Sequence, residues 1–137
     1  MPSEHARLGA SSAHRWTACP GSVQFSEGIP NSESPYAREG VAAHKLGEIC
    51  LNSKQEPSEY LGEELEGFEV TSEMADSVGL YFNEVMQIVL MQEAGLFVEE
   101  KVSLEALNPP EPMWETADAI MYSLSLKRLT VVDYKNG

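Results

Sequence analysis

Cysteine is scarce in this chain of 137 residues, and so is positive charge. The two cysteines, Cys19 and Cys50, are too few for a disulfide framework or a four-ligand zinc site. Nine Lys and Arg stand against 22 Asp and Glu, and the resulting formal charge of −13 repels a phosphate backbone unless a metal or a local basic patch intervenes. The composition therefore excludes a disulfide-stapled scaffold and argues against tight unaided binding of DNA.

Long hydrophobic runs are also missing. No stretch approaches the ~20 apolar residues that span a bilayer, and the N-terminus has no apolar segment of signal-peptide length. We therefore expect a cytoplasmic protein with no membrane partner. A hydrophobic fraction of 42%, with only 8 Pro and 10 Gly, is typical of globular proteins. The length predicts a single domain over residues 1–137.

Two long helices are expected in the first two thirds of the chain. Apolar residues recur at helical spacing over residues 35–52, and again from Thr71 or Ser72, either of which can cap a helix, to about residue 94. Gly95 suits the left-handed residue that follows the second helix. A short helix is also expected at residues 12–17, within a segment up to residue 36 that is otherwise mostly loop.

Strands are expected after the second helix. Residues 53–69, between the helices, are rich in glutamate and broken by Pro57, Gly62 and Gly67, which indicates a solvated acidic loop. After residue 95 the apolar spacing changes to that of strands at 96–104, 116–124 and 128–134. The sequence predicts an α/β (α+β) fold in which two N-terminal helices precede a three-stranded antiparallel meander.

Three polar residues near the end of the chain are candidates for chemistry. Asp118 and Asp133 fall in adjacent expected strands and can face one another, and Lys135 shares a face with Asp133 because strand side chains alternate. Two acids suit a hard divalent cation, and a nearby lysine can assist a water that attacks phosphorus. An Asp-x-Lys spacing is more often only a surface pair. The apolar neighbours of both acids favour a functional site.

The sequence around these residues resembles a known nuclease family. ETADAI at residues 115–120 and VVDYK at residues 131–135 resemble the active-site hairpin of the RecB-like and lambda-exonuclease-like branch of the PD-(D/E)xK superfamily. SSAHRWTACPGS at residues 11–22 resembles the opening of these proteins, and EGVAAHKLGE at residues 39–48 is similar to their first-helix motif. The resemblance covers nearly the whole chain and points to phage and prophage members.

The resemblance implies a site built on Mg²⁺ or Mn²⁺. It makes three residues catalytic: Asp118, Asp133 and Lys135, the last as the catalytic amine. It makes three residues metal ligands: His44, Asp118 and Asp133. Two further residues are candidate supports of these ligands: Glu39 and Glu48. Without the resemblance, a lone helical histidine is more often a satisfied core residue.

The chain departs from the family in two ways. Some relatives bind an iron–sulfur cluster, but Cys19 and Cys50 alone do not support one, so no cluster is expected. The family fold continues with a helix and a strand, whereas this chain ends at Gly137. We therefore expect a fold that lacks its C-terminal helix and strand. Its open sheet edge would be covered by a partner or by self-association.

These features leave several functions open. The chain could be a fragment of a longer DNA nuclease, one half of a split nuclease, or a truncated product with a binding role. In that last role, an acidic phage protein would occupy the nucleic-acid groove of a host defence complex, in the manner of an anti-CRISPR inhibitor. A structural phage protein with no surviving chemistry is a further alternative.

Overall fold

The computed structural model describes residues 6–30 and 34–136, so Gly137, the end of the expected hairpin, lies outside the described residues. The chain separates into two compact units. Unit 1 consists of Met1–Ser32 with Lys101–Thr116, and unit 2 of Glu33–Glu100 with Ala117–Gly137. The single domain expected over residues 1–137 stays a prediction.

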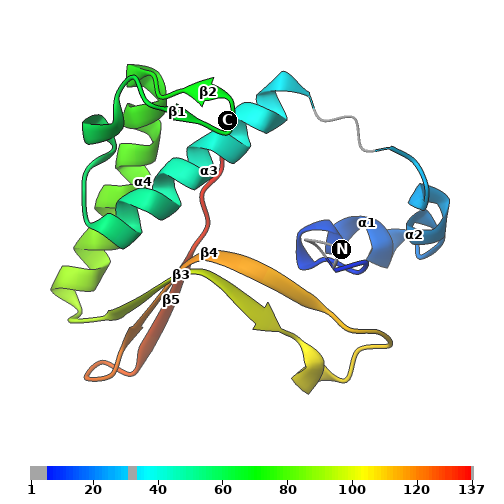
Figure 1. Cartoon of the computed structure of the whole chain (residues 1–137). Coiled ribbons are helices and arrows are strands. Elements are labelled where there is room, and N and C mark those ends of the chain that lie inside the picture. Colours follow the sequence, from blue (N-terminus) through cyan, green and yellow to red (C-terminus); the bar gives the residue numbers. More distant parts are fainter. Residues whose placement is uncertain (1–5, 31–33, 137) are drawn as a thin grey trace. The chain divides into compact units, whose positions relative to one another are not determined.

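The secondary structure is a mixture of helices and a sheet, which confirms the predicted α+β class (Figure 1). The described residues form four α-helices, namely α1 (Ala13–Ala18), α2 (Gly21–Ser26), α3 (Pro35–Ser53) and α4 (Ser72–Met91). They form five strands, namely β1 (Glu64–Leu65), β2 (Phe68–Glu69), β3 (Gly95–Ser103), β4 (Trp114–Ser123) and β5 (Arg128–Val132). Three short 3-10 helices complete the list: η1 (Ala10–Ser12), η2 (Pro57–Tyr60) and η3 (Glu105–Leu107). No described helix combines the length and the apolar character needed to cross a membrane.

Helix α3 confirms the first long helix to within one residue. The Ser34 side chain accepts a hydrogen bond from the Ala37 amide, and Pro35 occupies the first turn, so local sequence fixes the start. The helix ends where Lys54 turns left-handed, at φ 60°. One face is buried in unit 2 through six residues: Ala42, Ala43, Leu46, Gly47, Cys50 and Leu51.

Helix α4 starts as expected and ends earlier. Thr71 caps it by accepting a hydrogen bond from the Met74 amide. The prediction that it reaches residue 94 and that Gly95 is the left-handed residue is wrong, because α4 ends at Met91 and Gly95 is the first residue of β3. Glu93 is left-handed instead, at φ 47°, and the Ala94 amide donates to the Val89 carbonyl. This is the hydrogen bond that closes a Schellman motif, and Ala94 is buried beneath it.

The acidic segment between α3 and α4 is more ordered than the sequence predicts. The expected loop contains η2 and the β1–β2 hairpin, whose turn places Glu66 and Gly67 at φ 51° and 79°. Two consecutive left-handed residues are typical of a tight hairpin turn. Leu65 and Phe68 pack against the core of unit 2, which explains why a glutamate-rich stretch folds here. Helix α2, in the segment expected to be mostly loop, was also missed.

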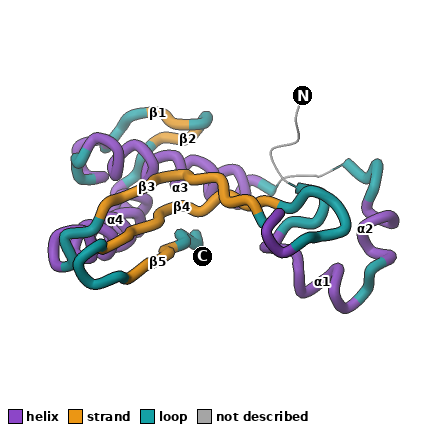
Figure 2. Tube along the Cα trace, turned by 90° about the horizontal axis from the view of Figure 1, so that it is seen from below, coloured by secondary structure: helices purple, strands orange, loops and turns teal. Residues whose placement is uncertain are grey.

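The main sheet has the expected meander order, β3-β4-β5, and α3 and α4 lie over one face of the part that belongs to unit 2 (Figure 2). Ala119 pairs with Val132, and Ser123 with Arg128, in the antiparallel β4–β5 ladder. The Ser123 hydroxyl donates to the Gln92 carbonyl at 2.7 Å and ties β4 to the end of α4.

The expected strand ends shift in the structure. β4 begins at Trp114, two residues early, and β5 stops at Val132 instead of reaching residue 134. Residues 133–136 are irregular. They are held by contacts with the Asp118 carboxylate and with α4, and not by strand pairing.

The sheet exposes apolar side chains on its other face. Tyr122, Leu129 and Val131 are 40%, 64% and 57% exposed. Tyr122 and Leu129 are paired across the strands, so they point to the same side of the sheet. The expectation that a partner or a second copy covers the open sheet edge stays a prediction.

Two glycines in the long helices of unit 2 should respond oppositely to alanine. A Cβ at Gly79, inside α4, would meet nothing within 4 Å, so Gly79→Ala should raise the free energy of unfolding by about 0.5–1 kcal/mol. A Cβ at Gly47 would lie 3.1 Å from the Tyr81 ring, so Gly47→Ala should lower that free energy. Urea denaturation followed by circular dichroism measures both. Equal effects of the two substitutions would contradict the packing described here.

Candidate metal centre

Three side chains from three elements of unit 2 form a cluster of possible metal ligands. His44 comes from α3, Glu99 from β3 and Asp118 from β4, and each offers a ligand atom within 4.8 Å of the others. His44 Nδ1 lies 3.5 Å from Asp118 Oδ1. The structure therefore brings together two of the three ligands expected from the sequence and adds Glu99.

Asp118 is the most buried member of the cluster, with a residue exposure of 8%. Its Oδ2 accepts a hydrogen bond of 2.6 Å from the backbone amide of Tyr134. Burial raises the pKa of Asp118, but the interaction with His44, the Tyr134 amide and the contact with the Asp133 carboxyl lower it more. The net pKa lies below the ordinary value, so Asp118 is a carboxylate at neutral pH.

His44 is half-buried, and its surroundings act on the protonation state of its imidazole. Its hydrogen bond with Asp118 raises the imidazole pKa, burial lowers it, and the negative charges of Asp118, Glu99 and Asp133 raise it again. The net shift is upward. A metal ion bound here would therefore compete with a proton for this imidazole.

Tyr134 supports the cluster, a role that no sequence pattern indicates. Its ring meets that of His44 edge-on, at 5.1 Å between centroids and 80° between planes. The Ser77 hydroxyl lies 2.8 Å from the Tyr134 hydroxyl, which donates to Asn136 Oδ1 at 3.1 Å. Tyr134 thus holds His44 with its ring and Asp118 with its amide, and packs both against α4.

Glu99 reaches the cluster through an unusual backbone conformation. It lies within β3 but has φ 51°, a left-handed value that costs a residue with a Cβ of the order of 1 kcal/mol. Burial raises the pKa of Glu99, and the charges of Asp118 and Glu48 raise it further, against the opposing effects of His44 and Lys45. The periodicity of a strand cannot reveal a single reversed residue. Sequence reasoning therefore missed Glu99.

Asp133 and Lys135 lie beside the cluster and not within the group of three. Lys135 Nζ is 2.5 Å from Asp133 Oδ2, and the two side chains are 80% and 50% exposed. Asp133 also contacts the Asp118 carboxyl and lowers its pKa. The prediction that strand alternation aligns Asp133 with Lys135 is wrong, because β5 ends at Val132. The two side chains meet through an irregular segment instead.

The two supporting glutamates differ in their relation to the cluster. Glu48 lies one helical turn after His44, pairs with Lys45 at 2.8 Å, and its charge raises the pKa of Glu99. Over residues 6–30 and 34–136, no hydrogen bond or ion pair joins Glu39 to any of these groups. Glu48 is thus the better candidate for support.

The donor set fits a hard divalent cation. Carboxylate oxygens with one imidazole nitrogen suit Mg²⁺ or Mn²⁺ among the ions that proteins commonly bind. Burial is the main cause of the raised pKa of Glu99, and the charge of Asp118 adds to it; a bound cation would relieve the repulsion between the two carboxylates. By contrast, burial raises the pKa of the Cys50 thiol to about 11, so it is a poor thiolate ligand.

The pKa of His44 provides a direct test of this geometry. We expect His44 to titrate above its ordinary value, and Asp118→Asn to lower that pKa, because the main cause of the upward shift is removed. The stabilisation from this pair should be fully present below the unfolded pKa of about 6.5 and should be lost as pH rises through the folded pKa. NMR titration of the imidazole carbons measures the shift. Glu73→Gln, an exposed change outside the cluster, should leave it unaltered.

The family comparison covers the whole of this centre. No solved structure matches the chain. Residues 5–137 match the family model described as a protein of unknown function, DUF2800. The match leaves the PD-(D/E)xK resemblance a proposal, because the family has no assigned activity. Since it spans nearly every residue, the chain belongs to the DUF2800 family.

Proposed function

We propose that this protein is a Mg²⁺- or Mn²⁺-dependent phosphodiesterase of the PD-(D/E)xK type that acts on DNA in the cytoplasm of a phage-infected host. The observation that carries the proposal is the cluster of His44, Glu99 and Asp118, with ligand atoms within 4.8 Å of one another. The Asp133–Lys135 pair beside it supplies the second carboxylate and the amine expected of such a site.

The ligand roles follow from burial and charge. Asp118 would be the central ligand, because it is a buried carboxylate whose position is fixed by the Tyr134 amide. His44 and Glu99 would complete the inner set, and Asp133 would support it through its contact with Asp118. A divalent cation held there polarises a phosphoryl oxygen and lowers the pKa of water.

Lys135 would act at the exposed side of the centre. Its side chain is 80% exposed and its ammonium group pairs with Asp133, so it can meet a phosphate that arrives from solvent. From there it would orient the attacking water and stabilise the negative charge that develops on the phosphoryl oxygens. Asp133 would limit the motion of the lysine, which makes it a positioning residue as well as a neighbour of the ligands.

The charge distribution makes DNA binding dependent on the cation. Unit 2, which holds the cluster, carries 17 of the 22 acidic residues and only 6 of the 9 basic ones. Such a surface repels a phosphate backbone at any distance that salt does not screen. Removal of divalent cations should therefore abolish DNA binding as well as cleavage.

Isothermal titration with Mn²⁺, followed by cleavage of linear DNA on the same samples, tests the proposal. Wild type should bind Mn²⁺, Asp118→Asn should abolish binding, and Glu99→Gln should weaken it about 10- to 100-fold. Lys135→Ala should keep Mn²⁺ binding and lose cleavage by about 100-fold or more, because the lysine is not a ligand.

The control for these variants is Glu73→Gln, which removes one exposed negative charge from the same unit without touching the cluster. It should bind Mn²⁺ and cleave DNA as wild type does. If wild type neither binds Mn²⁺ nor cleaves DNA, the enzyme proposal is wrong for this chain.

One observation favours the second candidate function, an acidic counter-defence protein. Glu64 pairs directly with Glu69 across the β1–β2 hairpin, and like charges placed opposite one another destabilise a strand pair. No basic side chain of the described range forms an ion pair with either glutamate. A basic partner would relieve the repulsion between these two glutamates, and the nucleic-acid groove of a host defence complex is a partner of that kind.

A plasmid-interference assay in a host with an active CRISPR system separates the two functions. For the inhibitor, wild type and Asp133→Ala should both block interference, whereas the double variant Glu64→Gln, Glu69→Gln should not. For the nuclease, Asp133→Ala should lose its activity on DNA and the hairpin variant should keep it. Loss of interference blocking in Asp133→Ala would count against the inhibitor.

A further inference from the structure

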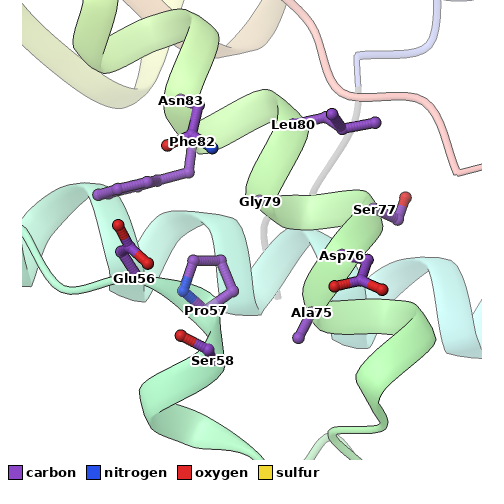
Figure 3. Close-up of a pocket in the computed structure, with 10 residues that line it drawn as sticks. All are labelled: Glu56, Pro57, Ser58, Ala75, Asp76, Ser77, Gly79, Leu80, Phe82 and Asn83. Carbon is purple, nitrogen blue, oxygen red and sulfur yellow. The ribbon is translucent and has the colours of Figure 1, made fainter.

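A groove on unit 2, away from the metal cluster, carries a second inference. It lies between η2 and α4 and has a volume of ≈ 460 Å³ (Figure 3). The buried residues Pro57, Ala75 and Phe82 form its apolar part. Leu80 lines the same groove and is 76% exposed. Its two large apolar side chains, Leu80 and Phe82, both come from α4, and Pro57 is the apolar residue on the η2 side. An open groove with such a lining is a site for another apolar side chain.

Gly79 lies in this groove and has no role within the described fold. A glycine inside a helix costs stability relative to alanine, and it usually persists where something must approach the backbone closely. A Cβ at this position would meet nothing within 4 Å, so no described part of unit 2 makes that approach. The space over Gly79 is therefore open to a residue from another molecule.

Two carboxylates border the groove. Glu56 enters from the η2 side and Asp76 from α4, as Figure 3 shows. Both are exposed, and within the described residues neither forms an ion pair with a basic side chain. An apolar groove with acidic borders is complementary to a segment in which basic residues accompany an apolar one.

The chain itself contains one such segment, the β4–β5 turn. Lys127 and Arg128 form its only pair of adjacent basic residues, and they lie between Leu126 and Leu129, which are 54% and 64% exposed. Neither basic side chain forms an ion pair among the described residues. We name residues 124–129 the basic turn.

The basic turn is held in a fixed shape. The Ser123 hydroxyl donates to the Gln92 carbonyl at 2.7 Å and accepts from the Leu126 amide at 3.3 Å. Because Ser123 anchors the turn at the C-terminal end of α4, the turn cannot reach the groove of its own chain, which lies along residues 75–83 of that helix. A groove of this kind could receive the turn only from a second copy.

We propose that this protein associates head to tail, with the basic turn of one copy seated in the groove of the next. Leu126 or Leu129 would fill the apolar space over Gly79, and Lys127 and Arg128 would meet Glu56 and Asp76. The net charge of −13 on each copy opposes association at long range, but salt screens distant charges more than charges in contact. The proposal does not depend on the metal centre, because the two sets of residues are distinct.

A head-to-tail contact makes an unusual prediction about mixtures. It uses two different surfaces, so copies can continue to add and form rings or filaments. Glu56→Lys with Asp76→Lys should block only the groove, and Lys127→Glu with Arg128→Glu should block only the turn. Each double variant alone should be monomeric. Mixed in equal amounts, they should form a one-to-one heterodimer and nothing larger, since each retains one intact surface.

Sedimentation velocity of the full chain in about 0.15 M salt, over a range of concentrations, measures these states. Wild type should form species beyond the monomer, and both double variants should raise the dissociation constant at least tenfold. The matched control, Glu59→Lys with Glu73→Lys, makes the same charge change outside the groove and should associate as wild type does.

Gly79→Gln keeps the proposal testable if a charge variant fails to fold. A longer side chain should fill the groove and prevent association without loss of helix content, and Mn²⁺ binding should be unchanged. The proposal is overturned if wild type stays monomeric at every concentration, or if the two blocked variants do not combine. It is also overturned if Tyr122→Ser on the exposed sheet face abolishes association while Gly79→Gln does not.

Discussion

The candidate centre depends on the contacts that the buried carboxylate of Asp118 makes. The carboxylate reaches α3 through His44, and it reaches the irregular segment after β5 through the Tyr134 amide. Three parts of the chain that share no hydrogen-bonded ladder are thereby joined at one side chain. Burial alone would drive this carboxyl towards its neutral form, so its anionic state depends on those partners. The same partners also orient the carboxylate, so the contacts that keep it charged are the contacts that hold it in place.

Much of the fold could be predicted from short-range patterns, because its two long helices begin with local signals. Ser34 and Thr71 each cap a helix within three residues, and apolar spacing gave α3 and α4 their buried faces. The end of α4 was harder to predict, because Gly95 is the better left-handed residue by propensity and Glu93 takes that role in the structure. The buried position of Ala94 explains the outcome, since the motif must close where that side chain enters the core.

The site was predictable only in part, for related reasons. The Asp-x-Lys spacing brought out Asp133 and Lys135, but their meeting depends on a strand that stops early, which alternation does not foresee. Glu99 was invisible because its position results from one reversed backbone angle in a glutamate-rich strand. Tyr134 was also missed, because a tyrosine beside a motif gives no hint that its amide holds one acid and its ring a histidine. Long-range contacts of this kind have no local signature.

The acidic residues of unit 2 lie in two different arrangements. Around Asp118 the acids lie close together, and the charge of Asp118 adds to the effect of burial in raising the pKa of Glu99. Along the β1–β2 hairpin they stand opposite one another, at a cost to the strand pair. The first arrangement suits an ion and the second suits a protein surface. One composition can therefore serve both chemistry and recognition.

The way the cluster is assembled also has a thermodynamic consequence. His44, Glu99 and Asp118 come from distant parts of the sequence, and only the completed packing of α3 against the sheet brings their ligand atoms together. An unfolded chain offers no comparable set, so a divalent ion would bind the native state alone. By mass action, each tenfold increase of free ion above its dissociation constant would then add about 1.4 kcal/mol to the free energy of unfolding. The concentration of that ion would thus help to set the thermal stability of the protein.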